Sequence, residues 1–162
     1  MDQRRLEDAV DRVEIRAVLE SYADIVSRRA WAELTDVMLA DTVLDLDLRE
    51  QTMVVTGPAA IGAFIAERIA GFEFFQFVIL NTRVQLRSGG DADRAASRMY
   101  MSELRQTHDG HWSQVYGVYH DHLRRVDGRW SLAHRTYHSL ARNNVPAALF
   151  DFPHHLTLDS LE

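Results

Sequence analysis

The chain has 162 residues, of which 46% are hydrophobic, and its formal net charge at pH 7 is -6. This length accommodates one domain with its own hydrophobic core and leaves no room for a second one. The sequence contains no cysteine, which excludes disulfides, thiolate zinc sites and cysteine nucleophiles. The basic residues are scattered singly and in pairs, so we expect no nucleic-acid partner.

The N-terminal segment, MDQRRLEDAVDR, is charged rather than apolar. No stretch of the sequence approaches the roughly 18 apolar residues that a helix needs to cross a bilayer. We therefore expect a cytoplasmic protein that does not bind membranes.

The N-terminal part of the chain predicts two helices followed by a strand. Apolar residues recur at helical spacing over about residues 6–27 and again over about 30–40. The stretch ADTVLDLDL then alternates between apolar and polar residues, which is typical of a strand with two different faces. Its leucines share one face, and Asp45 and Asp47 share the other.

A third helix and a run of antiparallel strands follow. Pro58 stands in the first turn of the segment PAAIGAFIAERIA, where its missing N–H costs nothing. Asp127-Gly128 is the strongest hairpin signal in the chain. Strands are predicted over about residues 75–87, 94–105, 112–126 and 129–141. Together these elements predict an α+β fold.

The order of these elements and several local sequences resemble one known family. The stretches IRAVLESYADIVSRRAWAELTDVMLADTV, TGPAAIGAFI, FVILN and YGVYHDHLRRVDGRWSLAHR are similar to the SnoaL-like branch of the NTF2-like superfamily, over about residues 10–141. That branch includes relatives of polyketide cyclases, scytalone dehydratase, bile-acid dehydratase and ketosteroid isomerase. The resemblance implies a cone in which a curved antiparallel sheet wraps around a long N-terminal helix and two shorter helices and encloses a pocket. It implies a fold more than a reaction, because one scaffold hosts many activities.

The usual catalytic pair of this family is missing. In the dehydratase-like members, an aspartate five residues after a helix tyrosine works with a histidine four residues before an asparagine on the first long strand. Counting from Tyr22 leads to Ser27, and counting back from Asn81 leads to Phe77. Neither side chain titrates near neutral pH. Either the activity is lost, or it has moved to other residues.

The last predicted hairpin suggests where the activity could have moved. Its two-residue turn sets the register of the two strands. Without a bulge, Asp121 lies opposite His134, and Tyr119 lies opposite Thr136. The resemblance to scytalone dehydratase implies that the face with Tyr119 lines the pocket. We therefore expect Asp121 and His134 to face the pocket.

An aspartate across a strand pair can orient a histidine and raise its pKa toward neutral pH, which suits a general acid–base. In this hypothesis His134 is the acid or base, and Asp121 orients it. The family comparisons turn Asp47 and Glu103 inward, where either could be the second proton carrier. The residues expected to hold a substrate oxygen are Tyr22, Tyr119 and Asn81.

Each candidate residue also has a structural interpretation. Asp121 and His134 can satisfy one another's hydrogen bonds without taking part in a reaction. Asp47 can lie on a solvated or subunit-facing strand, and Glu103 can be an ordinary residue near a strand end. Tyr22 can belong to the core, although its buried hydroxyl still needs a partner.

The remaining candidates predict an apolar pocket without a metal. Phe77, Met99, Met101 and Ser27 are expected to line a pocket that suits a flat hydrophobic ligand. We expect no cofactor.

Two histidine pairs could bind zinc only with help from elsewhere. His120 and His122 share one face of a strand, but no third ligand is evident. The pair His154-His155 has the same weakness. We therefore expect no metal site.

We expect one SnoaL-like domain over residues 1–141 that binds a hydrophobic, ring-containing small molecule. If the protein is an enzyme, the expected chemistry is cofactor-independent dehydration, isomerisation or cyclisation next to a carbonyl. We also expect a homodimer or homotrimer, with His120, His122 and Tyr137 at the subunit interface. Residues 142–162 form an apolar tail that is expected to cover the pocket mouth or a partner subunit.

Two other functions stay open. The protein could bind a ligand without acting on it, which the residues Ser27 and Phe77 favour. It could also be a relative of the small, non-catalytic subunit of ring-hydroxylating dioxygenases and work only beside a larger, metal-bearing chain.

Overall fold

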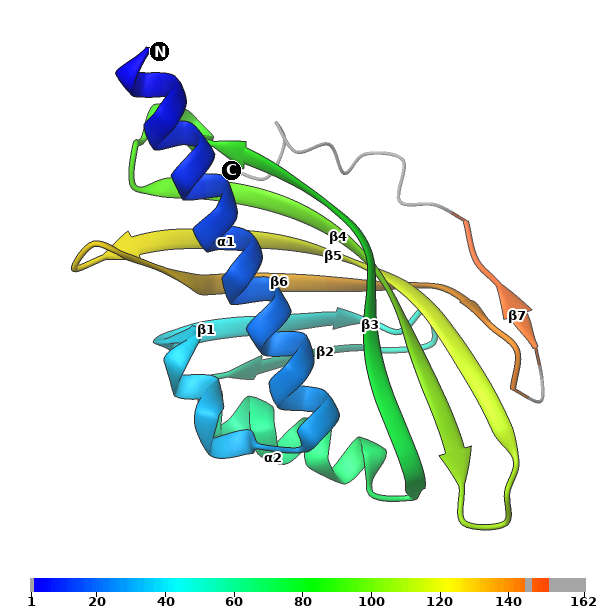
Figure 1. The fold of residues 1–162 in the computed structure, drawn as a ribbon. Helices are drawn as coiled ribbons and strands as arrows, with labels where there is room; N and C mark the ends of the chain where they lie inside the picture. The colour runs from blue at the N-terminus through cyan, green and yellow to red at the C-terminus, as the bar shows by residue number, and fades with distance from the viewer. Residues whose placement is uncertain (1, 145–146, 152–162) are drawn as a thin grey trace.

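The structure is a computed structural model and describes residues 2–144 and 147–151. A long helix, α1, lies across the concave side of a curved sheet, and a shorter helix, α2, lies near the strands β1 and β2 (Figure 1). The chain is therefore α+β, as the sequence predicts. Residues 152–162, which include His154-His155 and most of the predicted tail, lie outside the described residues.

The helices agree with the prediction except in one place. They are α1 (Gln3–Arg28), the 3₁₀ helix η1 (Trp31–Asp36), α2 (Pro58–Ile69) and the short 3₁₀ helix η2 (Ser88–Gly90). The second predicted helix is shorter than expected, because the strand already begins at Met38. Pairing with β6 extends the strand this far, since the backbone N–H of Leu132 donates to the carbonyl of Val37 at 2.9 Å.

The strands form one curved, unclosed mixed sheet in the order β2-β1-β6-β5-β4-β3, with β7 paired to β6. Among the described strands, only β1 and β6 run parallel to each other. Their bounds are β1 (Met38–Asp47), β2 (Thr52–Thr56), β3 (Phe72–Leu86), β4 (Arg94–Thr107), β5 (Trp112–Val126), β6 (Arg129–Arg142) and β7 (Ala148–Leu149).

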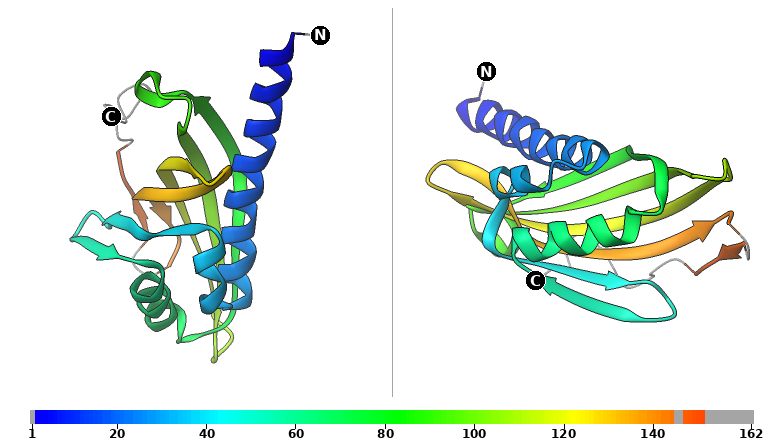
Figure 2. Two further views of the ribbon diagram at one scale, coloured as in Figure 1. Left: turned by 90° about the vertical axis from the view of Figure 1, so that its left-hand side faces the viewer. Right: turned by 90° about the horizontal axis from the view of Figure 1, so that it is seen from below.

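The apolar residues of α1 that are buried against the sheet lie from Ile15 onward. Ile15, Leu19 and Tyr22 repeat at helical spacing and are almost completely buried, and each such side chain contributes about 1.5–3 kcal/mol to stability. In the N-terminal half, Leu6 and Val13 remain exposed. The first turns of α1 extend past the sheet (Figure 2). The sheet thus holds one end of the helix and positions Tyr22.

Two bulges in β6 change which residues face α1. Pairing with β5 shifts by one residue between His122 and Leu123, which leaves Ala133 as the extra residue on β6. A second shift between Tyr116 and Gly117 does the same for Leu140. Each bulge reverses the alternation of the strand and increases its twist.

The first bulge makes the predicted register of this hairpin wrong beyond Leu123. Asp121 pairs with Arg135 rather than with His134, and Tyr119 pairs with Tyr137 rather than with Thr136. The register holds only near the turn, where Leu123 pairs with Leu132 as expected. The single extra residue on β6 is the physical reason, because the residues between it and the second bulge move to the other face.

None of the helices in the described part of the chain is long and apolar enough to cross a membrane.

Candidate functional site

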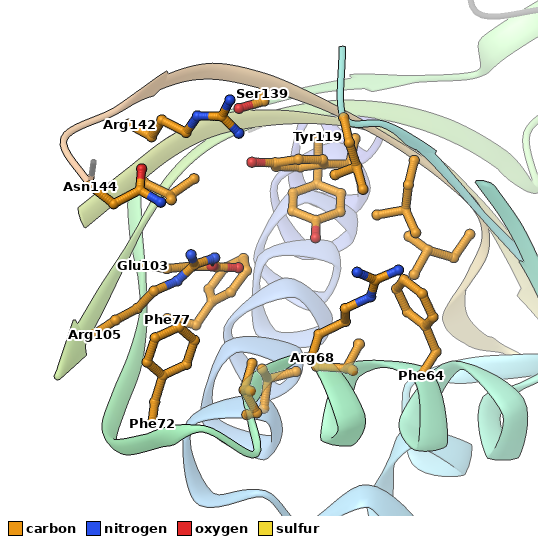
Figure 3. Close-up of a pocket in the computed structure, with 18 of the residues that line it drawn as sticks. Phe64, Arg68, Phe72, Phe77, Glu103, Arg105, Tyr119, Ser139, Arg142 and Asn144 are labelled. Carbon is orange, nitrogen blue, oxygen red and sulfur yellow. The ribbon is translucent and has the colours of Figure 1, made fainter. Parts of the chain in front are cut away.

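A cavity of about 360 Å³ opens between the C-terminal half of α1, the helix α2 and the concave side of the sheet. Leu44 and Leu46 of β1 form one wall together with Leu48, which directly follows that strand, and Phe64 of α2 lies nearby. Phe72 and Phe77 of β3 contribute further aromatic surface (Figure 3). Such an apolar hollow with a few polar groups is typical of a small-molecule site.

Four of the predicted site residues line this cavity: Tyr22, Phe77, Glu103 and Tyr119. Tyr22, Phe77 and Tyr119 form one aromatic cluster, with ring centroids 5.6 to 6.4 Å apart. Glu103 faces the cavity, as the family comparison implied.

Asp121 and His134 do not form the predicted pair, and neither lines the cavity. Asp121 is fully buried and accepts a hydrogen bond from Arg135 Nε at 2.7 Å. His134 instead pairs with His122, and their ring centroids lie 6.0 Å apart. The bulge at Ala133 turns His134 away from the face that Asp121 and Arg135 share. The expected dyad is therefore wrong in its geometry.

Asp47 also lies away from the cavity. Its Oδ2 is 3.1 Å from Nδ1 of His138. Burial acts to raise the pKa of Asp47, but the backbone N–H of Arg49 and the His138 ring hold that pKa below its ordinary value. The alternation of the strand predicted that Asp47 lies on the face opposite the leucines, away from the cavity. The family comparison predicted that Asp47 points into the cavity, and that prediction is wrong for this chain.

The remaining predicted residues lie beside the cavity or outside it. Met99 and Met101 are completely buried in the core, and neither lines the cavity. Asn81 is exposed at a bulge in β3. Ser27 does not line the cavity, but its Oγ accepts a hydrogen bond from the backbone N–H of Phe77 at 3.0 Å. The two positions where relatives carry the acid–base pair are thus neighbours here, although neither can titrate.

A buried guanidinium supports the aromatic cluster. Arg135 is completely buried, and its Cζ lies 4.0 Å from the ring centroid of Tyr22 and 4.2 Å from that of Tyr119. Its charge is balanced by Asp121, whose Oδ2 also accepts from Ser97 Oγ at 3.2 Å. A buried ion pair needs such additional hydrogen bonds to offset its desolvation.

The tyrosines of the cavity remain protonated at neutral pH. Burial raises the pKa of Tyr22 above its ordinary value, against the opposing charge of Arg135. Burial likewise raises the pKa of Tyr119 well above its ordinary value and raises that of Tyr137. The nearby Glu103 carboxylate raises all three pKa values further. Their hydroxyls can therefore donate hydrogen bonds to a ligand oxygen.

Tyr137 reaches the cavity because β5 carries a glycine opposite its ring. A Cβ atom at Gly117 would lie 2.2 Å from Cε2 of Tyr137. The ring centroids of Tyr119 and Tyr137 lie 5.0 Å apart. Tyr137 thus lies on the inner face rather than at the predicted subunit interface, because the bulge at Ala133 moves it there.

Charged side chains surround the open side of the cavity. Glu103 forms an ion pair with Arg105. Glu50, between β1 and β2, pairs with Arg142 of β6 at 2.6 Å. Arg68 of α2 is the third lining arginine (Figure 3). All three arginines are absent from the predicted site, since they come from separate elements and follow no motif.

The histidines on the other face of β5 and β6 form a separate group. His120 Nε2 accepts a hydrogen bond from Arg98 Nε at 3.0 Å, and its ring centroid lies 6.0 Å from that of His138. Burial lowers the pKa of His120 to about 4. Within residues 2–144 and 147–151, no three His, Cys, Asp or Glu side chains are grouped so that they could hold a metal ion.

Solved structures of known proteins share this architecture. A candidate aromatic ring hydroxylase from Novosphingobium aromaticivorans is 26% identical, with a TM-score of 0.70 over 82% of this chain and 90% of that one. A candidate scytalone dehydratase from the same organism is 14% identical, with a TM-score of 0.75 over 93% and 97%. The hexachlorocyclohexane dehydrochlorinase LinA-type3 from Novosphingobium barchaimii is 15% identical, with a TM-score of 0.75 over 92% and 99%.

These neighbours confirm the predicted NTF2-like cone. A search of curated proteins finds no match. The family model of the SnoaL-like domain matches residues 7–136, which is most of the chain. The chain therefore belongs to the SnoaL-like domain family.

Proposed function

We propose that the protein binds a hydrophobic, ring-containing small molecule in this cavity and acts on it by cofactor-independent proton transfer. The reaction class is dehydration, isomerisation or cyclisation next to a carbonyl. One observation carries the proposal: the Glu103 carboxylate lines the same aromatic cavity as three tyrosines that burial keeps protonated. This is a base next to hydrogen-bond donors, in a hollow large enough for a ring compound.

In a dehydration, the Glu103 carboxylate removes the proton from the carbon next to the substrate carbonyl. The electron pair of that C–H bond passes into the enolate, whose oxygen accepts hydrogen bonds from Tyr22 and Tyr119. The enolate then expels the hydroxyl group on the neighbouring carbon, which leaves as water after it takes a proton. Glu103 can supply that proton, so the step needs no oxidant and no other reactant.

The names of two structural neighbours agree with this class of ligand. One is a candidate scytalone dehydratase and the other a hexachlorocyclohexane dehydrochlorinase. Their likeness to this chain concerns the fold, so it supports a ring-shaped ligand only indirectly. A homodimer or homotrimer, as many cone-shaped proteins of this family form, is part of the proposal.

The decisive experiment combines Glu103→Gln with a panel of hydroxylated cyclic ketones. We expect mass spectrometry to show loss of water from at least one compound with the unmodified protein. The variant should lower turnover about 100-fold or more, the usual contribution of a general base, while binding changes only a few-fold. Glu73→Gln is the control, because Glu73 is exposed at the start of β3. Equal turnover in the Glu103 variant would contradict the proposed base.

Binding without reaction is a second candidate, which Ser27 and Phe77 favour because they replace the acid–base pair of relatives. It predicts that bound ring compounds are recovered unchanged in mass. Any altered product that depends on the protein would exclude it.

Membership of a larger assembly is a third candidate. It is favoured by the 26% identical neighbour, whose name refers to an aromatic ring hydroxylase. It predicts co-purification with a larger, metal-bearing chain, whereas homo-oligomers alone in light scattering of native material would argue against it.

A further inference from the structure

We infer that the ligand of this cavity carries one carboxylate group, which Arg68 binds at the cavity mouth together with Arg105 and Arg142. The inference rests on the proposed function, because it names the chemistry of the ligand that the cavity would hold.

Three guanidinium groups from distant parts of the chain face the same space. Arg68 comes from α2, Arg105 from β4 and Arg142 from β6, and all three line the cavity. Their side chains approach the cavity from different sides (Figure 3). This arrangement stands out in a chain whose formal net charge is -6. The local charge therefore favours an anion, although the overall charge does not.

The carboxylates at the cavity balance two of these arginines. Glu103 pairs with Arg105, and Glu50 pairs with Arg142 at 2.6 Å. Among the described residues that line the cavity, three positive charges and two negative charges leave an excess of one positive charge. That excess matches a monoanion such as a carboxylate and leaves the second charge of a phosphate monoester without a partner.

Arg68 provides the unbalanced charge. Within the described residues no carboxylate lies within ion-pair distance of it. Its Nη2 contacts the Met53 sulfur at 3.3 Å, and its Cζ lies 5.1 Å from the ring centroid of Phe64. A thioether is a weak acceptor, so the fork of donors on Arg68 remains available for a carboxylate.

Two further donors at the cavity lack an acceptor. The Nε atoms of Arg105 and Arg142 are buried and have no hydrogen-bond partner within the described residues. Asn144, which also lines the cavity, has a buried and unpaired Oδ1, and its amide can present either polar end. Buried polar groups without partners are unusual and are normally satisfied in the functional state. Ligand oxygens at the mouth would satisfy the two arginine donors.

The rest of the cavity suits the ring of such a ligand. Phe72 and Phe77 lie on the side of Arg105 (Figure 3), and the buried Tyr119 also lines the cavity. Aromatic side chains of this kind stack on flat rings. The geometry thus favours an aromatic or alicyclic carboxylic acid, with the ring inside and the carboxylate toward Arg68.

Titration calorimetry of the full chain at pH 7 with matched probes tests the inference. The probes are 2-naphthoate, its neutral analogue 2-naphthamide, and 2-naphthyl phosphate. We expect naphthoate to bind about tenfold more tightly than naphthamide, which is the effect of one charge-assisted hydrogen bond at this site. Arg68→Gln should remove that preference and leave the affinity for naphthamide unchanged. Because Arg68 is exposed, the variant should fold normally, which circular dichroism can check.

Arg83→Gln is the matched control, because Arg83 is exposed on β3 and does not line the cavity. It should keep the tenfold preference. Equal affinity for naphthoate and naphthamide in the unmodified protein would overturn the carboxylate site but leave the ring-binding function intact. Binding of naphthyl phosphate at least tenfold tighter than naphthoate would overturn the monoanion. Failure of all three probes to bind would count against the ring-binding function and the inference together.

Discussion

The two faces of the β5–β6 hairpin handle buried polar groups in opposite ways. On the inner face, Arg135 and Asp121 are both completely buried and form an ion pair at 2.7 Å. On the outer face, His120 is 2% exposed, and burial lowers its pKa to about 4, so its ring is neutral at pH 7. A buried group thus either keeps its charge beside a partner or gives the charge up.

Breaking the ion pair between Asp121 and Arg135 should have the largest effect on the free energy of unfolding. Asp121→Ala leaves the Arg135 guanidinium buried without its counter-ion, and we expect unfolding in urea to show a loss of about 3–5 kcal/mol. The control is Asp41→Ala, which breaks the exposed pair between Asp41 and Arg124 and should cost less than about 1 kcal/mol. Similar losses in both variants would mean that burial does not set the strength of these pairs.

The second largest loss of stability is expected where Gly117 and Tyr137 pack closely on the inner face. Gly117→Ala places a Cβ atom in the space of the Tyr137 ring, which must move. We expect a loss of about 1–3 kcal/mol, typical of overpacking, together with weaker ligand binding because Tyr137 lines the cavity.

Gly71→Ala is the matched control, since a Cβ at Gly71 meets nothing within 4 Å. A Gly117 variant as stable as this control would show that Tyr137 can move at no cost.

The titration of His120 on the outer face should make the stability of the protein depend on pH. The pKa of His120 is about 4 in the folded protein and about 6.5 in the unfolded chain, so the unfolded chain binds more protons between these values. The stability that the neutral ring provides is complete above about pH 6.5 and decreases as the pH falls toward 4. Urea midpoints measured between pH 7 and pH 4.5 should therefore fall.

His120→Gln should flatten this profile in part, because burial also lowers the pKa of His122 on the same face. The exposed His111→Gln should not change it. The carboxyl of Asp47 has a pKa below 3.8 and loses its contribution only at lower pH. A profile with the same slope in the His120 variant would assign the titration to another group.

The smallest effect is expected for His134. Since it lies on the outer face and does not line the cavity, His134→Ala should change ligand affinity less than twofold and stability by less than about 1 kcal/mol. Calorimetry with a ring compound and urea unfolding measure both. A large loss of affinity would mean that His134 contacts the ligand, and would contradict its position on the outer face.

Local patterns predicted the elements of this fold well. Period and turn signals suffice for α1, α2 and the four long strands, because each depends on nearby residues. Strand alternation likewise predicted that Leu44 and Asp47 face opposite sides, which the structure shows. Where the family comparison replaced that local argument for Asp47, the prediction was wrong.

The candidate site was predicted only in part. Tyr22, Phe77, Glu103 and Tyr119 line the cavity, while the proposed dyad does not. The register error arises from one extra residue, Ala133, which no turn or propensity signal reveals. Arg68 and Arg142 were missed for a related reason, since their proximity is created only when α2 and β6 pack around the same space.

The sequence by itself determined the family, the element order and the absence of the usual acid–base pair, because these depend on residue identity and local spacing. Tertiary structure alone decided which face of β6 is the inner one. The bulge at Ala133 brings Arg135 and Tyr137 to the concave side, and the bulge at Leu140 reverses the alternation again, so that Arg142 also faces that side. The physical reason is that strand residues alternate with a period of two, so one added residue exchanges the two faces of everything that follows.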